Sequence, residues 1–399
     1  MENAIIIGQG YTGRLGIARS VAMAGCDVTL IIIVPQLTRK YMRKPVDAYS
    51  KYVKKYYFTP NHDDQALVNL LLDRCKAPDH KPLIIPDSDF SEAAVDRNLE
   101  LLEEYFVCPH IAHTAGAAVL WMDKTRQKAL AKEVGLNVAN STVVNLAEDS
   151  FHLPESIVFP CFSKPLMSEE CGKIGLGRCE SEEELRDHLA LMKKGGAKLA
   201  LVEDFKKIDA EYALVGFSDG TNIHIPGLLE LLRVSHGYHL GVAVQGRIFP
   251  NACYEELVIK FKEFIRRIGF VGLFDIDFYR SGGVFFFGEM NLRFGGSGYA
   301  YTKMGVNLPA IMVDCMRKGI VVEETPLVQS EAVYMNERMA VDDWYYGFIS
   351  LKEYRDLYRE SDFSFIRDSE DPCPWRVFQC HYMKLRAYKI VKRWLKKRS

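Results

Sequence analysis

Apolar runs alternate with helical stretches in the first part of the chain. Ala4–Ile7 predicts a short buried strand, a helical stretch follows to Ala24, and the segment VTLIIIV predicts a second strand. A helix around residues 65–75 and the buried strand PLIIP, which ends at Asp87, continue the pattern. The polar segment YSKYVKKYYFTP between them is left unassigned. We therefore expect a Rossmann-like α/β unit over residues 1–112.

The pattern changes at residue 113, where a long helical segment is expected to run to residue 132. Turns such as SDGTN and RSGG then separate short apolar segments, which is typical of antiparallel hairpins. Strands are expected at 161–165, 199–205, 212–217, 223–225, 273–279 and 284–291. We expect an α+β body of two subdomains over residues 113–325, followed by a C-terminal segment over 326–399.

Composition narrows the classes of protein that fit. At 399 residues the chain is too long for one ordinary core, and 48% hydrophobic with 26% charged residues is typical of a globular protein. With a net charge of -1, the chain as a whole has no positive electrostatic field that would attract nucleic acid. The ten scattered cysteines predict neither a disulfide framework nor a zinc site. Without a signal-peptide pattern or a long apolar run, we expect a cytoplasmic protein.

The segment GLFDIDFYRSGGVFFFGEMNLRFGGSG holds the most informative polar residues. It predicts a hairpin in which Glu289, Asn291 and Arg293 share one face, with Asp277 on the other strand. Carboxylate and amide oxygens that converge suit Mg²⁺, and an arginine suits a transferred phosphoryl group. Asp275 lies on the same face as Asp277 and is the alternative ligand. An amphipathic hairpin with a solvated acidic face remains the simpler alternative; its apolar face is expected to hold Phe287, Gly288, Met290 and Leu292.

The string GEMNLR, with Asp277 twelve positions ahead of Glu289, resembles the metal-binding end of ATP-grasp enzymes. These include biotin carboxylase, the carbamoyl phosphate synthase large chain, D-alanine–D-alanine ligase and D-aspartate ligase. Three further segments follow the order of that family: WMDKTRQKALAKEVGL, FPCFSKPLMSEECGKIGLGR and LVEDFKKIDAEYALVGF. The resemblance covers about residues 1–320. It implies a Rossmann-like domain before an ATP-grasp body whose hinge lies near residues 203–205.

The resemblance also implies roles for individual residues. Lys124 and Lys164 would hold the α- and β-phosphates of ATP, and Lys173 would lie on a glycine-containing lid over the γ-phosphate. The lid sequence SEECGKIGLG departs from relatives that carry small polar residues there. The remaining implied residues are Glu203, Asp204 and Phe205 for adenine, Glu211 for ribose, Asp277, Glu289 and Asn291 for the metal, and Arg293, with Lys173, for catalysis.

The implied reaction is the ATP-dependent joining of a carboxylate to an amine through an acyl phosphate, with release of ADP and phosphate. ATP and Mg²⁺ are the implied cofactors, and Mn²⁺ is the alternative metal. Small-molecule carboxylate and amine substrates are expected as partners, together with a second copy of the chain in a homo-oligomer. The substrates themselves are not readable from the sequence; FGGSG after Arg293 and the segment at 86–90 are candidate walls of the acceptor site.

Two alternatives remain at this point. Gly8, Gly10 and Gly13 form a GxGxxG pattern after a strand, which is typical of dinucleotide-binding proteins. The second strand lacks the acidic residue that binds the ribose of NAD, but Arg39 or Lys40 would suit NADP, which would make the chain an oxidoreductase.

The second alternative rests on the C-terminal tail. From residue 384 to 398 eight Lys or Arg alternate with apolar residues, as in amphipathic helices that bind anionic membranes. The protein would then lie peripherally on the inner membrane surface and use its body as a nucleotide-binding scaffold. A terminal helix whose apolar stripe docks on the body is the structural explanation of the same pattern.

Overall fold

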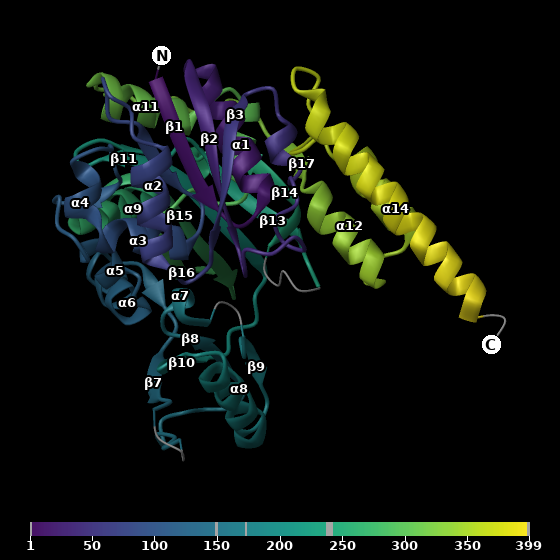
Figure 1. Cartoon of the computed structure of the whole chain (residues 1–399). Coiled ribbons are helices and arrows are strands. Elements are labelled where there is room, and N and C mark those ends of the chain that lie inside the picture. Colours follow the sequence, from purple (N-terminus) through teal and green to yellow (C-terminus); the bar gives the residue numbers. More distant parts are fainter. Residues whose placement is uncertain (1, 148–150, 172–173, 237–241, 397–399) are drawn as a thin grey trace.

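The computed structural model describes residues 2–147, 151–171, 174–236 and 242–396. Figure 1 shows a large upper body, a smaller unit below it and a long terminal helix that extends to one side. The described residues form two four-stranded sheets and one ten-stranded sheet. The expected combination of α/β and α+β architecture is therefore confirmed.

The first four-stranded sheet is parallel, in the order β3-β2-β1-β4. Its central strands are apolar on both faces because helices cover the sheet. The bounds are Glu2–Gly8 (β1), Cys26–Val34 (β2), Val53–Pro60 (β3), Leu83–Pro86 (β4), Tyr11–Met23 (α1), Asp47–Tyr49 (η1), Asp64–Arg74 (α2), Asp89–Arg97 (α3) and Leu99–Glu103 (α4).

The Tyr- and Lys-rich segment that the polar pattern leaves unassigned forms the edge strand β3. Its lysines are exposed, and its burial pattern shows no long apolar run. An edge strand tolerates such charges, which also discourage pairing with another chain. The sequence pattern missed this strand because edge strands need little apolar surface.

The second four-stranded sheet is antiparallel, in the order β7-β10-β8-β9, and one helix packs on it through buried leucines. It is the lower unit in Figure 1. The bounds are Ser141–Asn145 (β7), Cys161–Pro165 (β8), Ser168–Cys171 (α7), Gly177–Cys179 (β9), Glu182–Lys194 (α8) and Leu199–Asp204 (β10).

The ten-stranded sheet contains the predicted hairpin as β15 and β16. Its main path is β18-β17-β14-β13-β11-β15-β16-β6, while β12 pairs with β11 and β5 with β15. The bounds are His110–Ile111 (β5), Asn137–Val138 (β6), Ala210–Asp219 (β11), Ile223–His224 (β12), Leu228–Val234 (β13), Ala243–Phe249 (β14), Phe270–Ser281 (β15), Val284–Asn291 (β16), Ala332–Met335 (β17) and Phe363–Ser364 (β18).

The single helix expected over residues 113–132 is wrong. Two helices, α5 (Ala117–Trp121) and α6 (Lys124–Glu133), occupy this region. The side chain of Asp123 accepts hydrogen bonds from two backbone N–H groups in the first turn of α6. An aspartate in this position caps the N-terminus of a helix, so α6 begins here as a separate helix with Lys124 as its first residue.

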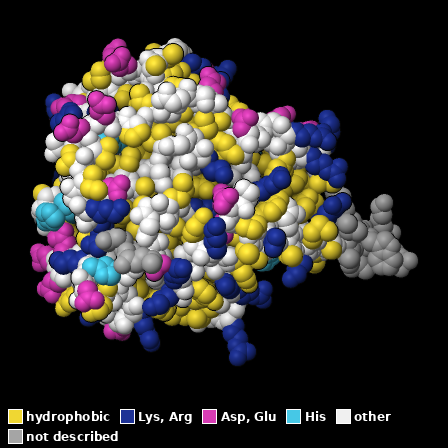
Figure 2. Space-filling view, turned by 90° about the horizontal axis from the view of Figure 1, so that it is seen from above, with side chains coloured by type: hydrophobic (Ala, Val, Ile, Leu, Met, Phe, Trp, Pro, Cys, Tyr) yellow, Lys and Arg dark blue, Asp and Glu magenta, His cyan; other side chains and the backbone are white. Residues whose placement is uncertain are grey.

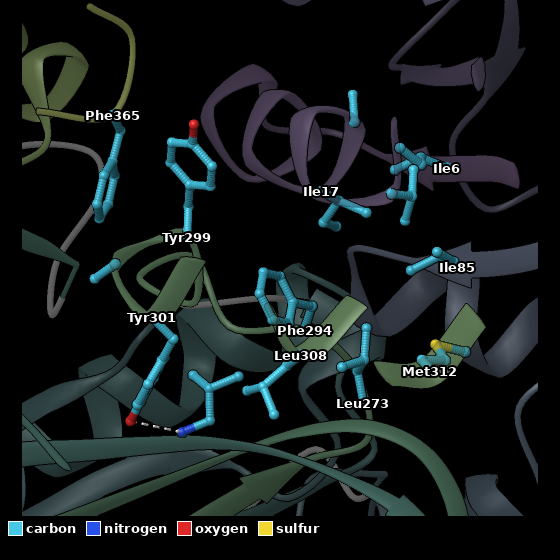
Figure 3. Packing of buried hydrophobic residues seen from close by; sticks show 14 of the residues in the cluster. Ile6, Ile17, Ile85, Leu273, Phe294, Tyr299, Tyr301, Leu308, Met312 and Phe365 are labelled. Atoms are coloured by element: carbon cyan, nitrogen blue, oxygen red, sulfur yellow. Dashed lines mark hydrogen bonds between the residues drawn. The ribbon is translucent and has the colours of Figure 1, made fainter. Parts of the chain in front are cut away.

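One apolar core joins the parallel sheet to the ten-stranded sheet. Figure 3 shows Ile6 and Ile17 from the first sheet and its helix above Leu273 of β15. The hydroxyl of Tyr301 donates to the carbonyl oxygen of Gly227 at 2.9 Å, so its polar end is satisfied inside this core. We propose the same domain division near residues 112 and 325, with a core that is continuous across it.

The other helices cover the ten-stranded sheet or follow it, and their bounds complete the fold. They are Ala252–Tyr254 (η2), Glu255–Ile268 (α9), Tyr299–Lys303 (α10), Leu308–Lys318 (α11), Glu337–Tyr346 (α12), Leu351–Glu360 (α13) and Pro372–Lys396 (α14). No helix of the described residues is both long enough and apolar enough to cross a bilayer.

A buried ion pair ties the start of the chain to the beginning of α14. Arg19 of α1 donates from Nε to Asp371 at 3.0 Å and from Nη1 to the carbonyl oxygen of Phe365 at 2.8 Å. The hydroxyl of Ser50 donates a further hydrogen bond to Asp371 at 2.7 Å. The charges are almost fully buried, and a buried pair is tolerated when such hydrogen bonds satisfy its remaining atoms.

The described part of α14 docks on the body. Phe378 and Tyr382 are buried in a cluster with residues of α12 and α13, and the Tyr382 ring lies 5.4 Å from that of Tyr354. Figure 2 shows Lys and Arg side chains among apolar ones on the side where α14 extends. Of the apolar stripe predicted over 384–398, Leu385 packs against this cluster and Tyr388 is exposed, so docking of the helix rests on Phe378 and Tyr382.

Replacing Tyr382 with Ala should lower the free energy of unfolding by about 3 kcal/mol, because it removes a buried aromatic side chain. Tyr388→Ala, on the same helix at 56% exposure, is the matched control and should change it by less than about 0.5 kcal/mol. Denaturant unfolding measures both. Equal effects would contradict docking of the helix through Tyr382.

Candidate active site

The oxygen-bearing residues expected from the hairpin lie on adjacent strands. Asp277 of β15 stands opposite Glu289 of β16, and Asp275 stands opposite Asn291. Opposed residues of an antiparallel pair have Cβ atoms about 4.5–5.5 Å apart on the same face. The fold therefore brings together the three predicted metal ligands and places Asp275 beside them.

A β-bulge shapes this hairpin. Asp277 pairs with Glu289 and the next residue pairs with Phe287, so Gly288 is the extra residue. Strict alternation would place Phe287 on the same face as Glu289, but the bulge turns Phe287 into the core. A Cβ atom at Gly288 would lie 2.8 Å from the carbonyl oxygen of Asp277, so the close approach requires glycine.

Three buried lysines converge on this face. Lys124, the first residue of α6, has its Nζ atom 3.4 Å from Glu289 Oε2. Lys164 of β8 has its Nζ atom 3.2 Å from Glu203 Oε2. Lys128, one turn after Lys124, forms an ion pair with the other oxygen of Glu203. The predicted phosphate-binding lysines are thus in one site, and Lys128 is an addition.

The charges of this group are coupled. Burial acts to lower the pKa of Lys164, but the carboxylates of Glu203 and Glu289 outweigh it and the pKa is raised. Burial acts to raise the pKa of Glu203, but Lys164 and Lys128 outweigh it and the pKa is lowered. Burial lowers the pKa of Lys128, and the nearby carboxylate of Glu203 opposes this shift only in part. Lys164 and Glu203 therefore hold each other in their charged forms.

Gln127 attaches α6 to the hairpin. Its side-chain oxygen accepts from the backbone N–H of Met290 at 2.8 Å, and its amide nitrogen donates to the carbonyl oxygen of Met290 at 2.9 Å. Because Met290 is the neighbour of Glu289, these bonds fix the distance between the lysines of α6 and the hairpin.

Arg293 follows β16 and is held by an acidic partner. Its Nε atom donates to Asp89 Oδ1 at 2.6 Å. Burial acts to lower the pKa of Arg293, but Asp89 and Asp275 outweigh it and the pKa is raised. The guanidinium group is therefore permanently charged at the carboxyl end of the hairpin.

Asp275 is a buried carboxyl group on the same face as Asp277. Burial, followed by the charges of Asp277 and Glu289, raises its pKa well above the usual range, and Arg293 opposes the shift only in part. Its Oδ1 atom is buried and makes no hydrogen bond within the described residues. An orphaned carboxylate oxygen beside other oxygen donors fits a hard cation such as Mg²⁺.

Some of the residues expected to bind adenine already make contacts with other parts of the protein. The backbone N–H of Phe205 donates to the carbonyl oxygen of Pro160 at 3.3 Å, and Arg178 lies over the Phe205 ring at 4.2 Å. Asp204 accepts from the side chain of Asn140 at 2.9 Å. Glu203 directs its side chain to the lysines, so the adenine-binding role of these residues stays a prediction.

Glu211 lies on β11, opposite Tyr279 of β15, and is partly buried. Lys173 and the glycine before it lie outside the described residues. At the end of the same loop, the carbonyl oxygens of Gly175 and Gly177 accept from the Ser163 hydroxyl at 3.1 and 3.3 Å. The roles predicted for Glu211 and Lys173 stay predictions.

The glycine pattern near the N-terminus accommodates a carboxylate. A Cβ atom at Gly8 would lie 2.8 Å from Asp87 Cβ, and one at Gly13 would lie 2.6 Å from Asp87 Oδ1. Burial raises the pKa of Asp87 to about 7, although Arg14 and Arg293 act to lower it. A dinucleotide pyrophosphate would meet this acidic side chain, so the NADP alternative receives no support.

Sequence reasoning missed three residues of the site, Lys128, Gln127 and Glu92, and it included Asp89 only within the candidate acceptor wall at residues 86–90. Lys128 lies four positions after Lys124, so the helical period carried a signal for it. Asp89 and Glu92 come from α3, and only tertiary packing brings them to Arg293. A small cavity of about 20 Å³ is lined by Asp89, Glu92, Lys124, Glu289 and Arg293, among others.

Comparison with known proteins gives relatives at modest identity. No protein-family model matches the chain. Over 240 residues it is 29% identical to a formate-dependent phosphoribosylglycinamide formyltransferase from Bacillus velezensis. This match covers 58% of each protein. Over 200 residues it is 25% identical to the carbamoyl phosphate synthase large chain from Gemmatimonas aurantiaca, covering 49% of this chain and 18% of that one. The match spans little more than half of the first relative's length.

Solved structures give a broader match. The biotin carboxylase domain of 2-oxoglutarate carboxylase from Hydrogenobacter thermophilus, crystallised with MgADP, is 15% identical with a TM-score of 0.63, over 83% of this chain and 73% of that one. L-amino acid ligase from Bacillus licheniformis is 16% identical with a TM-score of 0.59, and the match covers 84% of this chain and 79% of that one. The chain has an ATP-grasp fold. The resemblance to the ATP-grasp superfamily is therefore confirmed.

Within this ATP-grasp fold the candidate site lies between two sheets. Lys164 comes from the small antiparallel sheet, whereas Glu289 comes from the ten-stranded sheet and acts on the pKa of Lys164. Both sheets therefore supply charges to one place. The fold explains why residues more than 100 positions apart converge.

Glu92 offers a pH-dependent test of this acidic region. Both of its carboxylate oxygens are buried without a hydrogen bond in the described residues, and burial, with Asp96 and Asp89, raises its pKa well above 4.5. The folded state thus keeps a proton that the unfolded state has already released. This group therefore lowers stability as the pH rises above about 4.5.

Glu92→Gln should raise the melting temperature by a few degrees at pH 8, and the gain should vanish near pH 4. The control is Glu100→Gln, at an exposed position of α4, which should show no such pH-dependent gain. Thermal melts from pH 4 to pH 8 measure both. A wild-type protein that stays the more stable one at pH 8 would contradict the buried, uncompensated carboxyl group.

Proposed function

We propose that the chain is an ATP-dependent ligase that phosphorylates a carboxylate and joins the resulting acyl phosphate to an amine. The observation that carries this proposal is the meeting of the buried Lys124 and Lys164 with the partly buried carboxylates of Glu289 and Asp277. Ammonium groups suit phosphates, and paired carboxylates suit the metal that accompanies them. The sequence and structural relatives support the same reaction class.

Lys124 and Lys164 would bind the phosphates of ATP. Each now faces a carboxylate within 3.4 Å, so an arriving phosphate would exchange for a protein anion. Such an exchange keeps each buried ammonium paired, which avoids the large penalty of an isolated buried charge. Lys128 would stay with Glu203 and keep that carboxylate in place.

Asp277, Glu289 and Asn291 would hold Mg²⁺, and Mn²⁺ is the alternative that the same oxygens would accept. When bound, the ion would reduce the charge of the phosphate oxygens and orient them. The unpaired Oδ1 atom of Asp275 supports an ion on this face. Release of Glu289 from Lys124 would free both groups for these roles.

Arg293 would stabilise the transferred phosphoryl group, and Lys173 would close over it from the lid. The pairing of Arg293 with Asp89 keeps its guanidinium group fixed, so little reorganisation is needed at the moment of transfer. We also propose that residues 203–205 contact adenine and that Glu211 accepts a hydrogen bond from ribose.

The proposed reaction has two steps. A substrate carboxylate oxygen attacks the γ-phosphorus of ATP, the bond to the β-phosphate oxygen breaks, and ADP leaves. The amine nitrogen then attacks the carbonyl carbon, inorganic phosphate leaves and the nitrogen loses a proton. The segment at residues 86–90 and FGGSG, which lie beside Arg293, would form walls of the acceptor site.

We propose a cytoplasmic enzyme that acts on small molecules and forms a homo-oligomer. The biotin carboxylase domain described above was crystallised as a dimer, which supports the latter point. Membrane-surface contact through α14 stays a prediction of its basic sequence, because Phe378 and Tyr382 of that helix pack on the body.

ADP release should be measured with Mg-ATP across a panel of amino acids and small carboxylic acids. We expect release that depends on both a carboxylate and an amine. Glu289→Gln should reduce this release by about 100-fold or more, since it removes a metal-binding charge and keeps the side-chain shape. The exposed Glu256→Gln is the control, and unchanged release in Glu289→Gln would refute the metal assignment.

Nucleotide binding gives a second test. Lys124→Ala should weaken ATP binding at least tenfold, about 1.4 kcal/mol, and leave adenosine binding nearly unchanged, because adenosine has no phosphates. Lys132→Ala, at an exposed position of the same helix, is the matched control. Isothermal titration calorimetry with ATP and with adenosine measures the affinities of the wild type and of both variants. Equal weakening of ATP and adenosine would mean that Lys124 acts through folding and not through phosphate binding.

A further inference from the structure

A second group of chemically active side chains lies apart from the proposed nucleotide site. Glu103, His110 and His113 each offer one ligand atom, and these atoms all lie within 4.8 Å of one another. His113 Nδ1 is 2.7 Å from Glu103 Oε1. The two imidazole rings stack with their centroids 3.6 Å apart.

Backbone geometry brings the two histidines together. His110 lies in β5 and is held by pairing with Val271 of β15. Ala112 and His113 then adopt φ angles of 50° and 52°, a left-handed conformation that non-glycine residues seldom adopt. The chain turns back, so His113 stacks on His110 and meets Glu103 at the end of α4. Conformations of this kind are kept where the surrounding structure requires them.

The donor set selects a class of metal. Two imidazole nitrogens and one carboxylate oxygen match zinc sites that keep one coordination position open. With metal–nitrogen bonds of about 2.0–2.1 Å, tetrahedral ligand atoms lie about 3.4 Å apart, which is within the 4.8 Å that separates the three ligand atoms at most. Because the two imidazole rings stack and each binds a metal in its own plane, one ring would turn out of the stack to reach a shared ion. Mg²⁺ prefers oxygen ligands, so this group differs in chemistry from the proposed ATP site.

The three residues lie on the wall of a cavity of about 740 Å³. Its lining also includes Lys81, Cys108 and Asp219, whereas the residues proposed to bind nucleotide and Mg²⁺ are not among the described residues that line it. An open coordination position would thus face a solvent-filled space that can admit water or a small anion.

We propose that Glu103, His110 and His113 form a binding site for a divalent transition-metal ion, with Zn²⁺ as the best match. The ion would replace the direct contact between His113 and Glu103, and any proton shared by that pair would be released to solvent. None of the three proposed ligands is a cysteine, which is why cysteine spacing in the sequence gave no sign of this site.

Binding of Zn²⁺ to the full-length protein in the absence of nucleotide tests this site. Isothermal titration calorimetry should show a site in the wild type that is weakened at least tenfold in His110→Ala and in His113→Ala. His152→Ala, at an exposed position in the small unit, is the matched control and should bind as the wild type does. Co²⁺ should give a visible absorption band in the wild type that both histidine variants lose.

Glu103→Gln is a second test that keeps the side-chain shape and both histidines, and it should also weaken Zn²⁺ binding. Circular dichroism of every variant establishes that it is folded. Wild-type protein that binds no Zn²⁺, or that binds it no better than the folded His110→Ala, His113→Ala double variant, would overturn the proposal. Glu289→Gln should leave this binding unchanged; loss of it there would assign the Zn²⁺ to the hairpin instead.

Discussion

The ion pairs of Glu203 with Lys164 and Lys128 are the interaction on which the rest of the site depends. All three groups are buried, and a buried charge without a partner is far less stable than one in water. Glu203 and Lys164 lie on adjacent strands of the small sheet, whereas Lys128 belongs to α6. The pairing therefore connects the small sheet to the helix that packs on the hairpin.

A chain of contacts leads from this pairing to Arg293. Lys124 and Lys128 lie on one face of α6, and Gln127 between them bonds to both backbone groups of Met290. The same strand presents Glu289 and ends just before Arg293, which α3 holds through Asp89. Because each group is held by an ion pair or a hydrogen bond within the protein, the charges are in position before any substrate arrives. Such preorganisation is the main means by which proteins stabilise charge during phosphoryl transfer.

Much of this arrangement could be predicted from local patterns. Alternation along 284–291 predicted that Glu289 and Asn291 share a face, and the GEMNLR string led to Lys124 and Lys164. Phe287 was expected on the apolar face and lies in the core, but the bulge at Gly288 that turns it there was not readable, because strict alternation would place Phe287 on the polar face. The break before α6 was missed although Asp123 is an ordinary capping residue. Asp89 and Glu92 of α3 reach Arg293 only through tertiary packing, and Glu103, His110 and His113 also come together from separate elements, about which periodicity gives no information.

The bonds of Arg19 also bear on how the protein is made. Its partners Phe365 and Asp371 lie about 350 residues further along the chain, so a ribosome completes α1 long before it reaches them. Until then, the nascent first domain must either leave this guanidinium group in water or bury it unpaired, which is strongly unfavourable. Helix α1 therefore cannot reach its final packing during most of synthesis, and the last part of the chain completes a unit that began first. Chaperones that bind partly folded nascent chains would find an incomplete surface on α1 until translation is nearly finished.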